Sequence, residues 1–138
     1  MITPDDDVGA VRKANDFYYN AISSLSLSLL ERAWAHEDYV VLIGPRHSSP
    51  TIGWRDVRAY YERTVGLLGR ISVKPIDPRI QVNGSCAWVI GREEIGNDSC
   101  TKDGTLISSQ PTMSTNVFEK ANGEWRMVSH HAQEILSV

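Results

Sequence analysis

The sequence lacks the features that mark several common classes of protein. It has 14 Lys and Arg against 17 Asp and Glu, a net charge of −3, and no positive cluster that could follow a phosphate backbone. No apolar run approaches the length needed to span a bilayer. The N-terminal stretch MITPDDDVGA is acidic, where a secretory signal would be basic. We therefore expect a cytoplasmic protein that binds neither nucleic acid nor membrane.

Cysteine and the short catalytic motifs are scarce as well. The two cysteines, Cys86 and Cys100, lack CxxC spacing, which predicts free thiols in a reducing compartment. There is no HExxH or comparable spacing, no nucleophile elbow, no phosphate loop and no dinucleotide fingerprint. The sequence therefore predicts no metal site and no cofactor.

What is present is an ordinary composition for one folded domain. Apolar residues make up 41% of the 138 residues and charged residues 22%. A chain of this length buries roughly two-thirds of its unfolded surface, enough for one hydrophobic core. We expect a single domain over residues 1–138.

Apolar residues at helical spacing predict two helices at the start of the chain. Thr3 can cap the first, whose apolar face runs from Val8 to Leu25. Ser26 or Ser28 can cap the second, which should end near His36. Both faces are apolar enough to pack on a sheet.

The rest of the chain is predicted to be mostly strand. A short strand at 39–43 precedes a third helix at about 55–68, and Asn83-Gly84 and Asn122-Gly123 are hairpin signals. Further strands are expected at 70–74, 79–82, 86–95, 105–120 and 124–135. Between two of them, the polar loop 97–104 should be a mobile tip with no residue packed in a core. This order predicts an α+β fold, with a curved antiparallel sheet of four to six strands around three N-terminal helices.

Four stretches resemble the nuclear transport factor 2-like superfamily, in particular its SnoaL-like and ketosteroid-isomerase-like branches. They are FYYNAISSLSLSLLERAWAHEDYVVLIGP, IGWRDVRAYYERTV, CAWVIGREEI and NVFEKANGEWRMVSHHA. The last is the most specific, because these proteins commonly end on a Gly-x-Trp-Arg strand that runs into a histidine. The resemblance implies a cone-shaped α+β barrel with an apolar cavity for a small molecule, and a homodimer formed through the outer sheet face.

The sequence departs from the ketosteroid isomerase pattern at one position. In that branch an aspartate base directly precedes the proline that closes the first strand, and here Gly44 precedes Pro45. A glycine cannot carry a proton. The tyrosine that stabilises the oxyanion in that branch would correspond to Tyr18 or Tyr19.

Two adjacent histidines, His130 and His131, are the main catalytic candidates. Successive side chains on a strand point to opposite faces, so one histidine should face the cavity and the other should not. A metal site formed by the pair alone is therefore sterically poor. An inward histidine could act as general acid or base. Strand alternation groups His131 with Trp125 and Met127, and His130 with Val128, and leaves open which set faces in.

Other polar and aromatic residues are candidates for the cavity wall. Tyr18, on the apolar face of the first helix, could stabilise an oxyanion. Glu93 and Glu94 are adjacent on a strand, so only one can face the interior, where a carboxylate could act as an acid or base. A pair exposed to solvent at the strand end is the favoured expectation. Candidate ligand-binding residues are Trp34, His36, His47, Trp54, Tyr61 and Asn116.

Two functions are compatible with these residues. One is an isomerase- or cyclase-type enzyme that uses general acid–base chemistry on an apolar carbonyl substrate. The other is a non-catalytic domain that binds a ligand or assembles as a dimer. Gly44 favours the second function, and the histidines and tyrosines favour the first.

Overall fold

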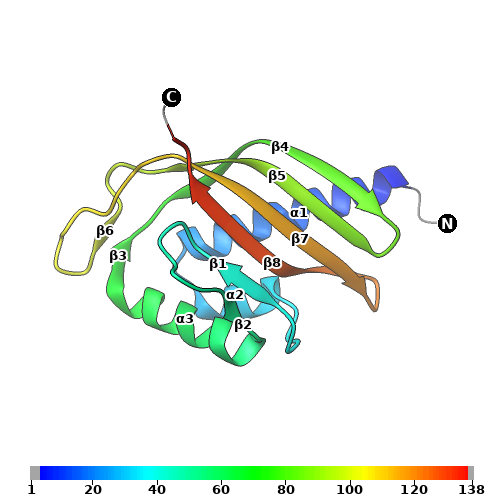
Figure 1. Cartoon of the computed structure of the whole chain (residues 1–138), viewed down its shortest axis with the longest axis horizontal. Helices are drawn as coiled ribbons and strands as arrows, with labels where there is room; N and C mark the ends of the chain where they lie inside the picture. Colours follow the sequence, from blue (N-terminus) through cyan, green and yellow to red (C-terminus); the bar gives the residue numbers. More distant parts are fainter. Residues whose placement is uncertain (1–3, 137–138) are drawn as a thin grey trace.

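The computed structural model describes residues 4–136, in which three helices pack against a six-stranded curved sheet (Figure 1). The helices are α1 (Pro4–Ser23), α2 (Leu27–Ala33) and α3 (Trp54–Leu67). The strands are β1 (Val41–Ile43), β2 (Thr51–Ile52), β3 (Leu68–Arg70), β4 (Val73–Asn83), β5 (Cys86–Ile95), β6 (Cys100–Thr101), β7 (Thr112–Ala121) and β8 (Glu124–Glu134). The predicted α+β fold is confirmed. The expected cap Thr3 lies outside the described residues.

The large sheet has the order β2-β1-β8-β7-β5-β4. Its four long strands pair antiparallel, as expected, but β1 runs parallel to β8, with Leu42 opposite His130. The sheet is therefore mixed. Strands β3 and β6 form a separate two-stranded sheet.

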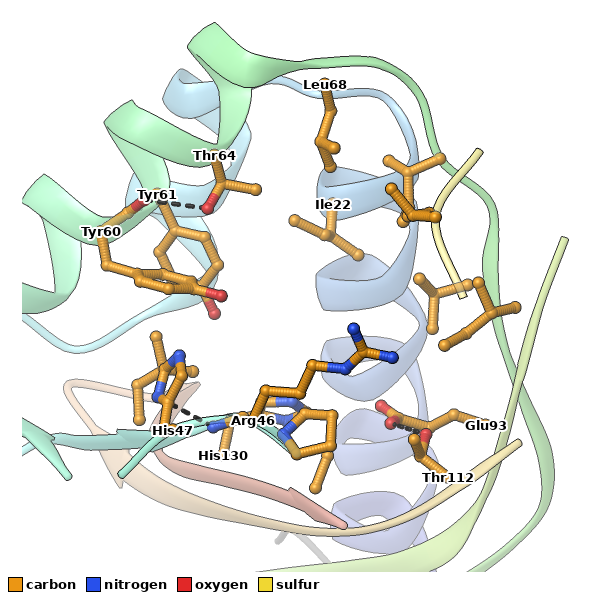
Figure 2. Close-up of a pocket in the computed structure, with 18 of the residues that line it drawn as sticks. Ile22, Arg46, His47, Tyr60, Tyr61, Thr64, Leu68, Glu93, Thr112 and His130 are labelled. Atoms are coloured by element: carbon orange, nitrogen blue, oxygen red, sulfur yellow. Dashed lines mark hydrogen bonds between the residues drawn. The ribbon is translucent and has the colours of Figure 1, made fainter. Parts of the chain in front are cut away.

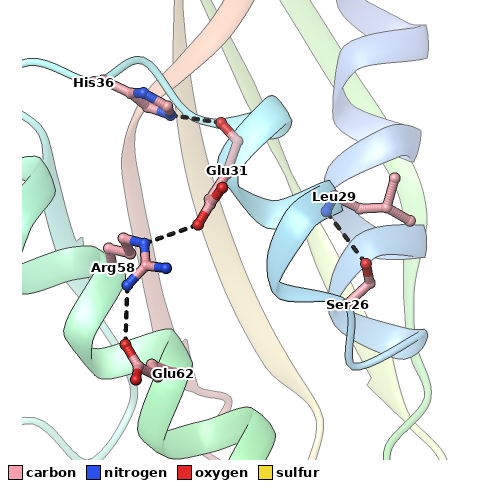
Figure 3. Close-up of polar contacts among 6 residues, drawn as sticks. All are labelled: Ser26, Leu29, Glu31, His36, Arg58 and Glu62. Carbon is pink, nitrogen blue, oxygen red and sulfur yellow. Dashed lines mark hydrogen bonds and ion pairs between the residues drawn. The ribbon is translucent and has the colours of Figure 1, made fainter.

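Helix α2 begins at one of its two predicted caps and ends earlier than its sequence pattern suggests. Its N-cap is Ser26, whose Oγ accepts a hydrogen bond from the Leu29 backbone N–H at 3.2 Å (Figure 3). The helix ends at Ala33, so His36 lies beyond it.

Polar contacts join α2 to α3. The guanidinium group of Arg58 donates to Glu31 on α2 at 2.8 Å and to Glu62 on its own helix at 2.9 Å (Figure 3). This ion pair spans the outer surfaces of the two helices and leaves their apolar faces to the core. No helix within residues 4–136 has the length and apolar character needed to cross a bilayer.

Two predictions about the second half of the chain are wrong, one about short strands and one about a loop. The two short strands expected on either side of Pro75 and Pro78 are one strand, β4, with a register shift where Asp77 takes a positive φ of 49°. The loop 97–104 does contribute a packed residue. Ser99 is fully buried, its Oγ accepts a hydrogen bond from the Ser72 backbone N–H at 3.3 Å, and the next two residues form β6. Cys86 and Cys100 are free thiols, and both are half-buried.

The hydrophobic core lies between α1, α2, α3 and the concave face of the sheet. Its largest fully buried side chains include Trp34, Tyr61, Phe118, Leu30 and Met127. Apart from Tyr61, which also lines the cavity, these residues close one end of the concave face. At the other end the helices diverge from the sheet and leave a cavity.

Candidate functional site

A cavity of about 470 Å³ opens between α1, α3 and the concave face of the sheet (Figure 2). This volume is within the range of small-molecule sites. Much of its wall is aliphatic, formed by Ile22, Leu42, Leu67, Leu68, Ile71 and Val73. Polar side chains reach it at a few places, so a bound molecule would be mostly enclosed by apolar surface and contacted by a small number of polar groups.

His130 faces this cavity and His131 faces away from it. His130 is buried and lines the cavity, whereas His131 is exposed on the opposite face of the sheet. The prediction that only one of the pair faces in is confirmed.

A β-bulge decides which histidine is inward. Val117 pairs with Ser129 while its neighbour Phe118 pairs with Met127, so Val128 is an extra residue on β8. An extra residue reverses the alternation of side chains beyond it. Met127 and His130 therefore share the concave face, although regular alternation would separate them.

His130 is held by a network of buried amides. Its Nδ1 lies 2.6 Å from Asn116 Oδ1. The Nδ2 of Asn116 donates to Asn15 Oδ1 at 2.9 Å and to Tyr19 Oη at 3.1 Å, which leaves the amide oxygen for the imidazole. Nδ1 of His130 must then carry a proton, and in the neutral ring Nε2 is unprotonated. Burial lowers the pKa of His130 below its usual range, so the neutral ring is favoured at neutral pH.

His47 lies at the rim of the same cavity with the opposite tautomer. Its Nδ1 accepts a hydrogen bond from the Gly44 backbone N–H at 3.0 Å, so the neutral ring carries its proton on Nε2. A Cβ atom at Gly44 would meet the His47 ring at 3.2 Å. The imidazole thus occupies the space beside Gly44.

Two tyrosine hydroxyls add to the polar part of the cavity wall, and the Tyr18 ring lies 5.1 Å from the His130 ring. Tyr18 Oη and Tyr61 Oη are 3.0 Å apart, and both side chains are buried and line the cavity. Burial raises the pKa of each phenol above its usual range, so both remain protonated at neutral pH. One hydroxyl hydrogen joins the pair, and the other remains available to a ligand oxygen.

Glu93 is a buried carboxylate that reaches the cavity, which corrects the expected position in solvent. Only Glu94 of the pair is exposed. Glu93 Oε2 accepts a hydrogen bond from Tyr19 Oη at 2.7 Å. Its Oε1 accepts one from Thr112 Oγ1 at 2.6 Å (Figure 2). The charge of Glu93 raises the pKa of the Tyr19 hydroxyl further, in addition to the larger effect of burial.

A sequence signal for Glu93 existed in the alternation of β5. Ala87 and Val89 are buried on this strand, and Glu93 follows them at even spacing. The strand does not end in solvent at this point, because Thr112 at the start of β7 covers it.

The other predicted ligand-binding residues are not all in the cavity. Tyr61 lines it, whereas Trp34 lies in the core beside Tyr61 and Asn116 lies behind His130. His36 and Trp54 stack on each other at 4.3 Å outside the cavity, and His36 Nε2 bonds to the Glu31 carbonyl oxygen. The prediction that His36 and Trp54 line the cavity is therefore wrong, since α2 ends before His36 and α3 only begins at Trp54. Across residues 4–136 no three His, Cys, Asp or Glu side chains are grouped to hold a metal ion.

Comparison with known proteins gives the family. A family model described as a SnoaL-like domain matches residues 11–133. The chain belongs to this family. A solved structure from Streptomyces avermitilis, called a dehydratase of the nuclear transport factor 2-like family, is similar to this SnoaL-like domain. It is 27% identical with a TM-score of 0.85, over 98% of this chain and 100% of the other. The resemblance seen in the sequence is confirmed.

Two further relatives of the SnoaL-like domain have different names. A structure from Thiobacillus denitrificans, called a calcium/calmodulin-dependent protein kinase type II association domain, is 26% identical with a TM-score of 0.71, covering 99% of this chain and 98% of the other. The F-box protein SKIP8 of Arabidopsis thaliana is 26% identical over 129 residues, which is 92% of this chain. The chain spans 50% of the length of that curated relative.

Proposed function

We propose that this SnoaL-like domain is an enzyme that moves a proton on a small, apolar carbonyl compound bound in the cavity. The observation that carries the proposal is the state of His130. Its Nδ1–H is fixed by Asn116, and its Nε2 has no hydrogen-bond partner among the described residues and belongs to a ring that lines the cavity. A neutral imidazole with a free nitrogen in an apolar cavity is a competent general base.

The proposed reaction begins at a carbon next to the carbonyl group. His130 Nε2 takes a proton from this carbon, and the electron pair moves onto the carbonyl oxygen. The free hydroxyl hydrogen of the Tyr18–Tyr61 pair donates to that oxygen and stabilises the enolate. The raised pKa of both phenols supports this role, because each group donates a hydrogen bond without losing its proton.

Two outcomes can follow from the enolate. His130 can return the proton to another carbon, which is isomerisation. Alternatively, His130 can give this proton to a hydroxyl group on the β-carbon, which leaves as water while the electron pair of the enolate forms the double bond of an unsaturated ketone. The relative called a dehydratase supports the second outcome.

The proposal is tested without knowledge of the natural substrate. Small cyclic ketones are incubated with the protein in D₂O, and deuterium incorporation next to the carbonyl is followed by NMR. Absorbance reports unsaturated product from the matching β-hydroxy ketones. His130→Ala should lower the exchange rate by on the order of 10²–10⁴-fold. His131→Ala is the matched control and should leave it unchanged, because His131 points to the outer face. Absence of exchange by the wild-type protein, or equal rates for the two variants, would favour a binding function.

A second candidate function, dimeric assembly, is favoured by the outer face of the sheet. Ile90 on β5, Met113 on β7 and Ile52 on β2 are exposed by 45%, 43% and 54%. The relative called an association domain also supports this candidate. We propose that a second copy of the chain covers this face in a homodimer of standard size, about 800 Å² per partner.

Light scattering tests the dimer. Ile90→Lys should shift the mass toward the monomer, because the charge would be buried in the proposed interface. Leu67→Lys changes another exposed apolar side chain away from this face and should have no effect. A monomeric wild-type mass at micromolar protein concentration would contradict the proposal.

A further inference from the structure

Four buried side chains form a continuous chain of hydrogen bonds from the cavity histidine to the cavity carboxylate. His130 Nδ1 meets Asn116 Oδ1 at 2.6 Å, Asn116 Nδ2 meets Tyr19 Oη at 3.1 Å, and Tyr19 Oη meets Glu93 Oε2 at 2.7 Å. The chain connects α1, β5, β7 and β8, and all four side chains are buried. We call these four residues the relay.

The direction of the relay is fixed at its carboxylate end. An ionised carboxylate has no hydrogen to donate, so the Tyr19 hydroxyl must donate to Glu93. The lone pairs of Tyr19 Oη are then free to accept from the NH₂ group of Asn116. This orientation of the amide places its oxygen at His130, and the imidazole must donate from Nδ1. Each donor in the relay therefore points from His130 toward Glu93.

Two further contacts bear on the same amide and hydroxyl. Asn116 Nδ2 also donates to Asn15 Oδ1 at 2.9 Å, which favours the same amide orientation. The Ser114 hydroxyl lies 3.1 Å from Tyr19 Oη and can adapt as donor or acceptor, so it does not select a direction. Glu93 is the charged end of the network and the only one of these groups that can accept but never donate.

We propose that Glu93 is a positioning residue that selects the Nδ1–H tautomer of His130 through Tyr19 and Asn116. The inference rests on the proposed function for its consequence in turnover, because a base at Nε2 requires this tautomer. The tautomer itself can be measured without any substrate. In a serine protease triad, a carboxylate performs the same task by direct contact with the imidazole. Here the carboxylate acts through two intervening side chains.

The relay has to be separated from a simple effect of charge. The titratable groups around His130 are Tyr18, whose ring centroid is 5.1 Å away, His47 at the rim, Glu93 on β5 and the adjacent His131. The negative charge of Glu93 also favours the protonated imidazole through space, against the larger effect of burial. A through-space effect needs Glu93 but does not need the Tyr19 hydroxyl.

The experiment uses the whole chain labelled with ¹⁵N-histidine and no ligand. Long-range ¹H–¹⁵N spectra at neutral pH distinguish a protonated ring nitrogen from an unprotonated one, and His130→Gln identifies the His130 signals by their loss. In the wild-type protein we expect the proton on Nδ1. Glu93→Gln should populate the Nε2–H tautomer as well, because a glutamine amide can donate to Tyr19 and allow the relay to reverse. Where ketone exchange is measurable, the loss in turnover should follow the population of the Nε2–H tautomer.

Two more variants complete the test. Tyr19→Phe removes the hydroxyl and keeps the charge, so it should also mix the tautomers. Ser114→Ala is the matched control, because it removes another hydrogen bond to the same oxygen and leaves the relay continuous. Backbone ¹H–¹⁵N spectra establish that each variant is folded, and Tyr19→Phe alone suffices if Glu93→Gln does not fold.

Several results would overturn the inference. One is an Nε2–H tautomer in the wild-type protein. Another is an unchanged tautomer in Glu93→Gln, which would mean that the amides alone select it. A third is an unchanged tautomer in Tyr19→Phe, which would mean that the relay through the Tyr19 hydroxyl is not needed. Failure to find ketone exchange would overturn the proposed function and would leave the tautomer result unaffected.

Discussion

The two ends of the concave sheet face are built from the same strands and differ in almost every physical property. At the closed end, Phe118 on β7 and Met127 on β8 are fully buried against Trp34. At the open end of the same strands, Thr112 and His130 line the cavity. The closed end holds the fold together, and the open end keeps polar groups in fixed positions.

The boundary between the two ends is the bulge at Val128. Before it, inward positions of β8 are apolar, and beyond it the first inward side chain is His130. Bulges redirect side chains near functional sites, at the cost of locally irregular pairing. The comparison teaches that one extra residue can convert a packed strand into one wall of a site without a change of sheet order.

The largest stability effect should come from the closed end. Phe118→Ala should lower the free energy of unfolding by about 3–5 kcal/mol, since it leaves a void in a rigid core. Ser114→Ala, two strand positions from Asn116, removes only a hydrogen bond and should lower it by about 0.5–1.5 kcal/mol. Urea unfolding measures both. Equal losses would show that the two ends do not differ as described.

A pH effect should come from the open end alone. Burial lowers the pKa of folded His130 below its unfolded value of about 6.5, so the unfolded chain binds more protons between these two values. The stability of the wild-type protein should therefore fall as pH falls from about 6.5 toward the folded pKa. His130→Gln cannot titrate and should lose less stability over the same range.

Thermal melting from pH 7.5 downward checks this difference. His36, His47 and His131 are present in both proteins, so the two differ at position 130 alone. A parallel decrease in both proteins would mean that His130 is not held neutral by burial.

The smallest loss of stability is expected at the N-terminus of α2, which covers the closed end. Leu30 and Ala33 of this short helix are buried, and Ser26 caps it. Ser26→Ala should cost about 1 kcal/mol, because the Leu29 N–H loses its acceptor. Ser28→Ala should cost less, since the Ser28 hydroxyl contacts only Ser26 Oγ among the described polar groups. Chemical denaturation of both variants measures these losses. A larger loss for Ser28→Ala than for Ser26→Ala would contradict the prediction and identify Ser28 as the N-cap.

The sequence by itself determined the three helices, most of the long strands and their order, because these depend on local periodicity and turn chemistry. Asn122 and Gly123 both take positive φ between β7 and β8, as the hairpin signal predicts. The fold class followed from that order. The apolar face of α1 was also predictable, with Asn15 as its polar exception.

Only the tertiary structure decided which side chains form the site. Regular alternation could not choose between His130 and His131, since the choice depends on a bulge set by the pairing of β8 with β7. Strand alternation put Glu93 on the face of Ala87 and Val89. Its burial could not be predicted, because it depends on Tyr19 and Thr112, which lie far from it in sequence. The position of His36 was predicted wrongly because α2 ends at Ala33, about one turn before the predicted end near His36. Periodicity is a property of neighbours in the chain, whereas the register of two strands is fixed by contacts between residues far apart.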